Sequence, residues 1–127
     1  LPVSLKRKVY NSCILPVLTY GAETWGLTKR VILKLRTTQR AMKRKMVGVT
    51  LRDRKRAEWV REITQVTDIL MKIKKNKWAW AGHVMRREDN RWPLRVTNGI
   101  PREGKCRRGW QKVRWADEVN FASVEWM

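Results

Sequence analysis

The chain is poor in the residues on which most catalytic and metal sites depend. Its 127 residues include one His and two Cys. Cys13 and Cys106 lie far apart and form no CxxC spacing, which favours reduced thiols over a disulfide framework. A zinc site needs four closely spaced ligands, whereas these two thiols and His83 supply three distant ones. We therefore expect no metal site.

Acidic residues are scarce as well, with 11 Asp and Glu in the whole chain. Two-metal polymerase chemistry needs paired carboxylates, commonly an Asp-Asp pair on a turn, and the sequence has no such pair. Glu88-Asp89 and Asp117-Glu118 are adjacent, but neighbours on a helix diverge by about 100°. Such adjacent acidic pairs are more typical of helix capping or of solubility than of catalysis. No Ser or Cys is accompanied by a recognisable general base, so the sequence does not point to nucleophilic catalysis. We expect a chain that is not itself an enzyme and needs no cofactor.

Long apolar runs are also missing. There is no stretch of eighteen consecutive apolar residues and no signal-peptide pattern, so we expect an intracellular protein without membrane contact. No segment of four to eight residues alternates strictly between apolar and polar, which argues against strands. The apolar share is nevertheless 43% with eight Trp, enough for a small core. The sequence predicts an all-α fold.

Basic residues are abundant: 30 Lys and Arg leave a net charge of +19. Self-repulsion of this size opposes folding, and phosphate would relieve it. A run of cations is often only a solvated face. Here cations occur in every segment, which favours RNA or DNA as a partner.

The helical periodicity predicts a small irregular bundle of about five helices, with a basic loop before the last. Ser4 begins the first helix, which Pro16 kinks or breaks, and Asp53 caps the third. The expected helices cover residues 4–20, 28–48, 53–64 and 111–124, and a fourth helix in chain order begins at 67 or 68 and ends at 86 or 87. A short turn is expected at 90–98.

The helix predicted at 28–48 has two different faces. Its apolar side carries Val31, Leu35, Thr38, Met42 and Met46 and is expected to pack into the core. The opposite side is basic, and its cations suit a phosphate backbone better than solvent alone. They are Lys29, Arg36, Arg40, Lys43 and Arg44.

A second basic side is predicted on the helix at 68–86. Small Ala79 and Gly82 lie beside it and would let a backbone or a nucleic-acid strand come close. Trp80 on this helix, and Trp59 on the preceding one, are expected to be buried. The candidate contact residues are Lys72, Lys75, His83 and Arg86.

The segment 101–110 reads as a flexible basic loop that ends in an aromatic residue. One alternative is a groove that follows a strand, with cations on phosphates and Trp110 stacked on an unpaired base. The other is a solvated linker that Trp110 anchors to the core. The cations concerned are Arg102, Lys105, Arg107 and Arg108.

Four blocks in series carry a family resemblance: residues 15–25 (LPVLTYGAETW), 53–68 (DRKRAEWVREITQVTD), 77–93 (KWAWAGHVMRREDNRWP) and 104–119 (GKCRRGWQKVRWADEV). Together they resemble the C-terminal end of the endonuclease/reverse transcriptase of LINE-type, non-LTR retrotransposons. The most specific piece is Trp-Ala-Gly-His at 80–83, followed by Arg91-Trp92. Similar proteins read Gly-Lys-Arg-x-Arg-Gly-Arg-Pro in the last block, where this chain has Cys106 and Gly109-Trp110-Gln111. That departure suggests a divergent copy.

The resemblance implies a piece of a longer polyprotein, in which 1–50 is thumb-like, 51–88 a central helical pair, and 89–127 a basic loop and C-terminal helix. Such a region holds template RNA or primer or target DNA beside an upstream polymerase domain, in the nucleus when it acts on DNA. The parent polymerase would use Mg²⁺, and no part of its active site lies here. The alternative is a retrotransposon-derived helical module that binds a protein partner.

Overall fold

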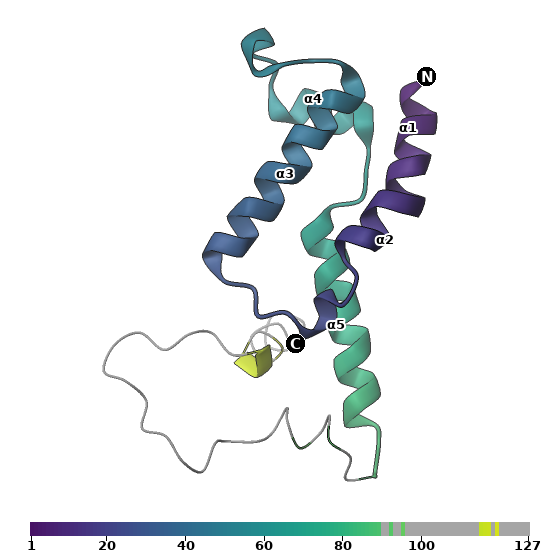
Figure 1. Cartoon of the computed structure of the whole chain (residues 1–127), viewed down its shortest axis with the longest axis vertical. Coiled ribbons are helices and arrows are strands. Elements are labelled where there is room, and N and C mark those ends of the chain that lie inside the picture. Colours follow the sequence, from purple (N-terminus) through teal and green to yellow (C-terminus); the bar gives the residue numbers. More distant parts are fainter. Residues whose placement is uncertain (90–91, 93–94, 96–114, 118, 120–127) are drawn as a thin grey trace, which may run out of the picture.

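The computed structural model describes residues 1–89, 92, 95, 115–117 and 119, and these form an all-α fold (Figure 1). No strand occurs in this part of the chain, which confirms the predicted class. Residues 115–117 and 119 are helical and fall inside the helix predicted at 111–124. The elements in order are α1 (Val3–Val9), the π turn η1 (Tyr10–Ile14), α2 (Leu15–Leu18), η2 (Ala22–Thr24), α3 (Lys29–Val47), η3 (Leu51–Asp53), α4 (Ala57–Thr64) and α5 (Ile69–Met85).

The N-terminal segment runs through Pro16 as one helical rod instead of breaking there. A proline has no N–H, and its ring presses on the carbonyl four residues earlier. The wider π turn just before it, in which the Leu15 N–H bonds to the Tyr10 carbonyl, accommodates that ring. The rod begins at Val3, so the expected cap at Ser4 lies inside the helix.

Both predicted ends of the second long helix, α3, are confirmed. Thr28 caps it by accepting a hydrogen bond from the Val31 N–H at 3.4 Å. Gly48 ends it at a φ of 80°, a left-handed conformation that glycine adopts without a Cβ clash. The Lys6 ammonium donates to the Met46 carbonyl at 3.0 Å, which satisfies one acceptor in the last turn and ties α1 to α3.

The predicted start of α4 is wrong by four residues. Asp53 is not its cap: the Asp53 Oδ2 accepts from the Thr50 N–H at 2.6 Å and from the Thr50 hydroxyl at 2.9 Å. These bonds close the short turn η3, and Arg54 then turns left-handed at a φ of 47°. α4 therefore begins only at Ala57.

The core lies where α3 and α5 meet the N-terminal rod, and Gln39 is buried within it. Its amide nitrogen donates to the Tyr10 hydroxyl at 3.2 Å and to the Thr67 carbonyl at 2.8 Å. Its amide oxygen accepts from the Ile69 N–H at 3.4 Å. Thr38, expected to face inward, is exposed. Leu35, Met42 and Met46 pack against the core as expected. Gln39 joins them in place of Thr38, because its amide finds partners on the N-terminal rod and at the start of α5.

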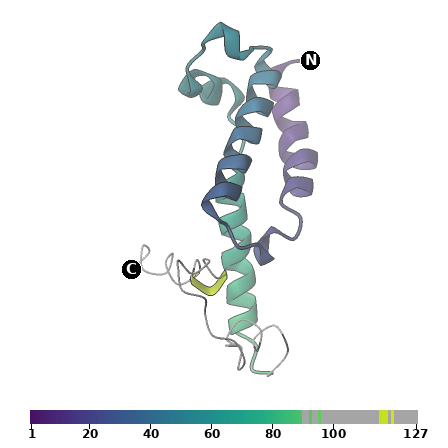
Figure 2. The same cartoon turned by 60° about the vertical axis from the view of Figure 1, so that its left-hand side comes forward.

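α5 begins at Asp68, one of its two predicted starts, whose carboxylate caps the helix by accepting from the Leu70 N–H at 3.2 Å. Ile73 is fully buried in its second turn, and the lower half of the helix continues past the ends of α2 and α3 in both views (Figures 1 and 2). There Trp80 meets Trp115 edge to face, with ring centroids 5.5 Å apart. The Trp115 indole donates to the Glu23 carbonyl, so Trp115 is tied to η2.

The two tryptophans expected to be buried behave differently. Trp80 is half-buried against Trp115. Trp59 is 39% exposed, and the Lys55 ammonium lies 5.5 Å from its ring centroid. The expected burial of Trp59 is wrong because α4 turns Val60 and Thr64 inward instead.

Candidate nucleic-acid interface

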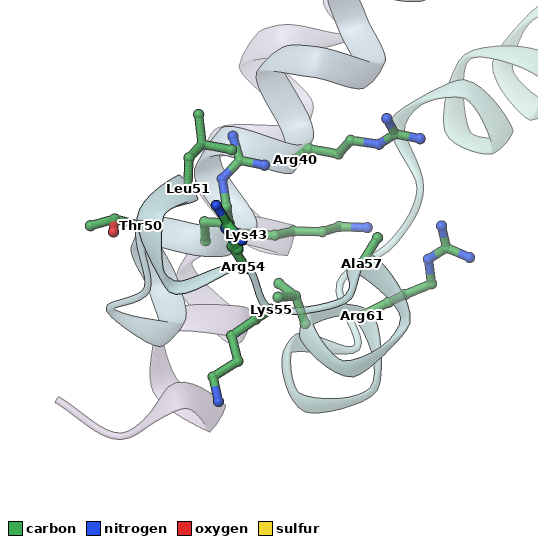
Figure 3. A pocket seen from close by; sticks show the side chains of 10 residues that line it. Arg40, Lys43, Thr50, Leu51, Arg54, Lys55, Ala57 and Arg61 are labelled. Carbon is green, nitrogen blue, oxygen red and sulfur yellow. The ribbon is translucent and has the colours of Figure 1, made fainter.

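A basic hollow lies between α3, η3 and α4 (Figure 3). It encloses about 110 Å³. Six cations from three separate segments line it, and Thr50, Leu51, Ala57 and Val60 supply the remaining wall. The cations are Arg40, Lys43 and Arg44 of α3, Arg54 and Lys55 of the linker, and Arg61 of α4.

Three of these cations extend to the same side of the hollow. Figure 3 shows the Arg40 and Arg61 guanidinium groups and the Lys43 ammonium directed to one side, with Lys43 between the two arginines. Lys55 extends away from them, toward Trp59. The fold therefore brings together like charges that lie up to 21 residues apart in the sequence, counting from Arg40 to Arg61.

Lys43 is the partly buried member of this group, and its pKa is lowered. Burial is the largest cause, since it removes water from the ammonium; the nearby charges of Arg61 and Arg40 add to the effect, and Asp68 opposes it. An anion placed among these three cations would favour the charged ammonium again. The hollow is thus electrostatically prepared for an anionic group.

The predicted basic side of α3 is only in part a solvent-facing row. Lys29, Arg36 and Arg40 are exposed, as expected. Lys43 and Arg44 are partly buried and line the hollow. The expected single face therefore divides: Lys29 and Arg36 lie outside the hollow, whereas Arg40 lines it together with Lys43 and Arg44.

The sequence interpretation missed the cations that the linker and α4 contribute to the hollow. Arg54, Lys55 and Arg61 were not among the predicted contact residues, yet all three line the hollow beside α3. The dense run Arg-Asp-Arg-Lys-Arg at 52–56 is the signal that could have singled out this segment. Its position opposite α3 depends on the left-handed turn at Arg54.

The candidate residues on α5 are spread along that helix, from Lys72 in its first turn to Arg86 at its C-terminal cap. Lys75, His83 and Arg86 are exposed, and Lys72 is partly buried. The Arg86 guanidinium folds back on Gly82, donating to its carbonyl at 2.8 Å. A Cβ on Gly82 would lie 3.3 Å from that guanidinium. The expected space beside Gly82 for an approaching strand is thus filled by Arg86.

The remaining candidates lie outside the described residues. They are Arg102, Lys105, Arg107, Arg108 and Trp110, so both alternatives for the basic loop stay predictions. Within the described ranges, no three His, Cys, Asp or Glu side chains are grouped so that they could hold a metal ion. Every helix in those ranges is too short or too polar to span a lipid bilayer.

Comparison with known proteins finds a curated relative of this chain. The chain is 36% identical over 119 residues to an uncharacterized protein of Caenorhabditis elegans that is provisionally named as transposon-derived. The match covers 91% of this chain and 43% of that protein, so the chain spans less than half of the relative's length. No family model and no solved structure matches. The similarity supports a transposon origin.

Proposed function

We propose that the chain is the C-terminal part of a non-LTR retrotransposon reverse transcriptase and that it holds RNA or DNA through the phosphate backbone. Four sequence blocks in matching order and the transposon-derived relative support the parentage. The observation that carries the binding function is the hollow, where three segments place six cations together.

Nucleic-acid binding explains an arrangement that is otherwise costly. A domain with a net charge of +19 lowers its electrostatic energy by spreading its cations apart. Here six of them gather, and two of these, Lys43 and Arg44, are partly withdrawn from water. A phosphate backbone offsets both costs, because its charge pairs with the cations and its counterions are released. Such contacts position a strand without reading its sequence.

The proposal extends to the parent protein. The chain itself would be no enzyme and would need no cofactor, whereas the parent polymerase would use Mg²⁺ bound by its own upstream carboxylates. Its partners would be RNA or DNA and the upstream polymerase domain of the same polyprotein, in the nucleus when it acts on DNA. The relative has more than half of its length outside the matched region, which leaves room for further domains.

Salt dependence tests the binding function. We expect the purified chain to bind single-stranded and duplex oligonucleotides with little sequence preference. Log affinity should fall linearly with log salt, by about 0.7 to 0.9 for each phosphate neutralised. Replacing Arg36, Arg40 and Lys43 together by Gln keeps helix propensity and should lower this slope by about two to three.

The matched control replaces Lys8, Lys34 and Lys74, three exposed lysines that do not line the hollow, by Gln. It removes the same charge and should change the slope less. Binding affinity that does not change with salt would overturn the proposed function. Equal slopes in the two triple variants would remove the side of α3 that carries Arg36, Arg40 and Lys43 from the interface.

A second candidate function rests on a separate observation. The N-terminal rod buries Tyr10 and Leu15 on one side but exposes apolar side chains on another, with Val17 77% and the following Tyr20 85% exposed. Such a row suits a helical module that binds a protein partner. An apolar interface of this kind weakens little as salt rises, so the same titration separates the two functions.

A further inference from the structure

We propose that the hollow between α3 and α4 is a discrete site for one phosphate group, held by Lys43 with Arg40 and Arg61 on either side. The inference rests on the proposed function in taking that phosphate from a nucleic-acid strand. It goes further because it assigns the phosphate to one recessed site with three specified side chains instead of to a diffuse basic face.

The size and lining of the hollow favour a phosphate over a nucleobase. A single water needs about 10–15 Å³ of such space, so a volume of about 110 Å³ admits a tetrahedral anion with a few waters. The wall contains no aromatic ring on which a base could stack, since its uncharged members are Thr50, Leu51, Ala57 and Val60. The Thr50 hydroxyl already donates to Asp53, which leaves the cations as the donors for a ligand.

The three side chains proposed to bind the phosphate combine two guanidinium groups with one ammonium group. The guanidinium groups of Arg40 and Arg61 can each donate two parallel hydrogen bonds to phosphate oxygens. The Lys43 ammonium between them adds a compact charge. The lowered pKa of Lys43 is consistent with an ammonium that lacks an anion at close range.

One acidic group acts against the site. Asp68, the cap of α5, raises the pKa of Lys43 through its negative charge, and the same charge repels a phosphate. Arg44, Arg54 and Lys55 line the rest of the hollow and add positive potential. Removing the Asp68 charge without removing the cap should therefore strengthen phosphate binding.

A bound phosphate would also join α4 to α3. α4 buries only Val60 and Thr64 of its eight residues, so little apolar contact holds it in place. A phosphate bound by Lys43 and Arg61 bridges the two helices. Binding should consequently protect the segment 52–61, which is rich in trypsin sites, from cleavage.

Three single substitutions in the full chain test the site. Lys43→Met keeps an unbranched side chain of similar length in a partly buried position. Lys34→Met is the control, because it removes the same charge from an exposed position of the same helix. Asp68→Asn keeps a good helix cap and removes the opposing charge.

The probes are inorganic phosphate and one single-stranded oligonucleotide, with and without a 5′-phosphate, at constant ionic strength. Lys43→Met should weaken oligonucleotide binding about tenfold or more, the loss expected for a charge-assisted hydrogen bond, and Lys34→Met about twofold or less. Asp68→Asn should strengthen it. Tighter binding only of the phosphorylated oligonucleotide assigns the site to a terminal phosphate, and equal binding assigns it to an internal phosphodiester.

Equal losses in Lys43→Met and Lys34→Met would overturn the site while leaving salt-dependent nucleic-acid binding intact. Binding of inorganic phosphate without any binding of oligonucleotide would keep the site and overturn the proposed function. A measurement on the unmodified chain guards against a variant that fails to fold. There, NMR titration of the lysine side chains should find one pKa that rises when phosphate is added, and no such rise would reject the site.

Discussion

Replacing Gln39 by Met tests the packing that organises the whole fold. Gln39 is 5% exposed and bonds to the Tyr10 hydroxyl, the Thr67 carbonyl and the Ile69 N–H. Met has a similar length and volume but makes none of these bonds, so the change leaves little cavity and isolates the polar contribution.

The expected loss follows from the geometry of the three bonds. The two bonds donated by the amide nitrogen, at 2.8 and 3.2 Å, contribute about 1 kcal/mol each. The third, at 3.4 Å, is weak, but its loss leaves the Ile69 N–H buried without an acceptor. We expect Gln39→Met to lower the free energy of unfolding by about 2–3 kcal/mol, a large part of the roughly 5–15 kcal/mol typical of a domain.

Urea unfolding followed by circular dichroism measures this loss. The control is Thr38→Ala, an exposed position that should change the stability by about 0.5 kcal/mol or less. A second readout is the titration of Tyr10: burial raises the pKa of its hydroxyl, and the hydrogen bond from Gln39 lowers it. Losing that bond should raise the pKa further. If Gln39→Met were as stable as the parent and Thr38→Ala were not, Thr38 and not Gln39 would face the core.

Three further predictions concern stability. Gly48→Ala should cost about 1 kcal/mol in thermal unfolding, because Gly48 has a φ of 80° and alanine is strained there, and a variant of unchanged stability would contradict that cap. Trp80→Ala should cost about 3 kcal/mol, and Trp59→Ala about 1 kcal/mol or less because its ring is exposed; equal losses would mean that α4 is turned differently. Hydrogen bonds from the Thr50 N–H and then its hydroxyl lower the pKa of the Asp53 carboxyl. Their stabilising effect is present above the ordinary pKa of 3.8 and lost as the pH falls through the folded value, so Asp53→Asn should flatten this part of the stability–pH curve.

The candidate site was predictable only in part, for a reason that lies in its geometry. Arg40 and Lys43 were found from the sequence because a basic stripe on one helix repeats every three or four residues. Arg61 lies on another helix, and no local pattern links it to α3. Its place in the hollow depends on the turn η3, where Asp53 bonds to Thr50 instead of capping α4.

The sequence by itself determined the all-α class and several helix ends. Thr28, Gly48 and Asp68 act through hydrogen bonds and backbone angles within one turn, so their neighbours in the chain suffice to place them. The burial of Gln39 in place of Thr38 was decided only by the tertiary structure. Thr38 and Gln39 are adjacent and differ by about 100° around the helix. Gln39 turns inward because Tyr10 and Thr67, far away in the sequence, satisfy its amide, and a local apolar pattern carries no information about such partners.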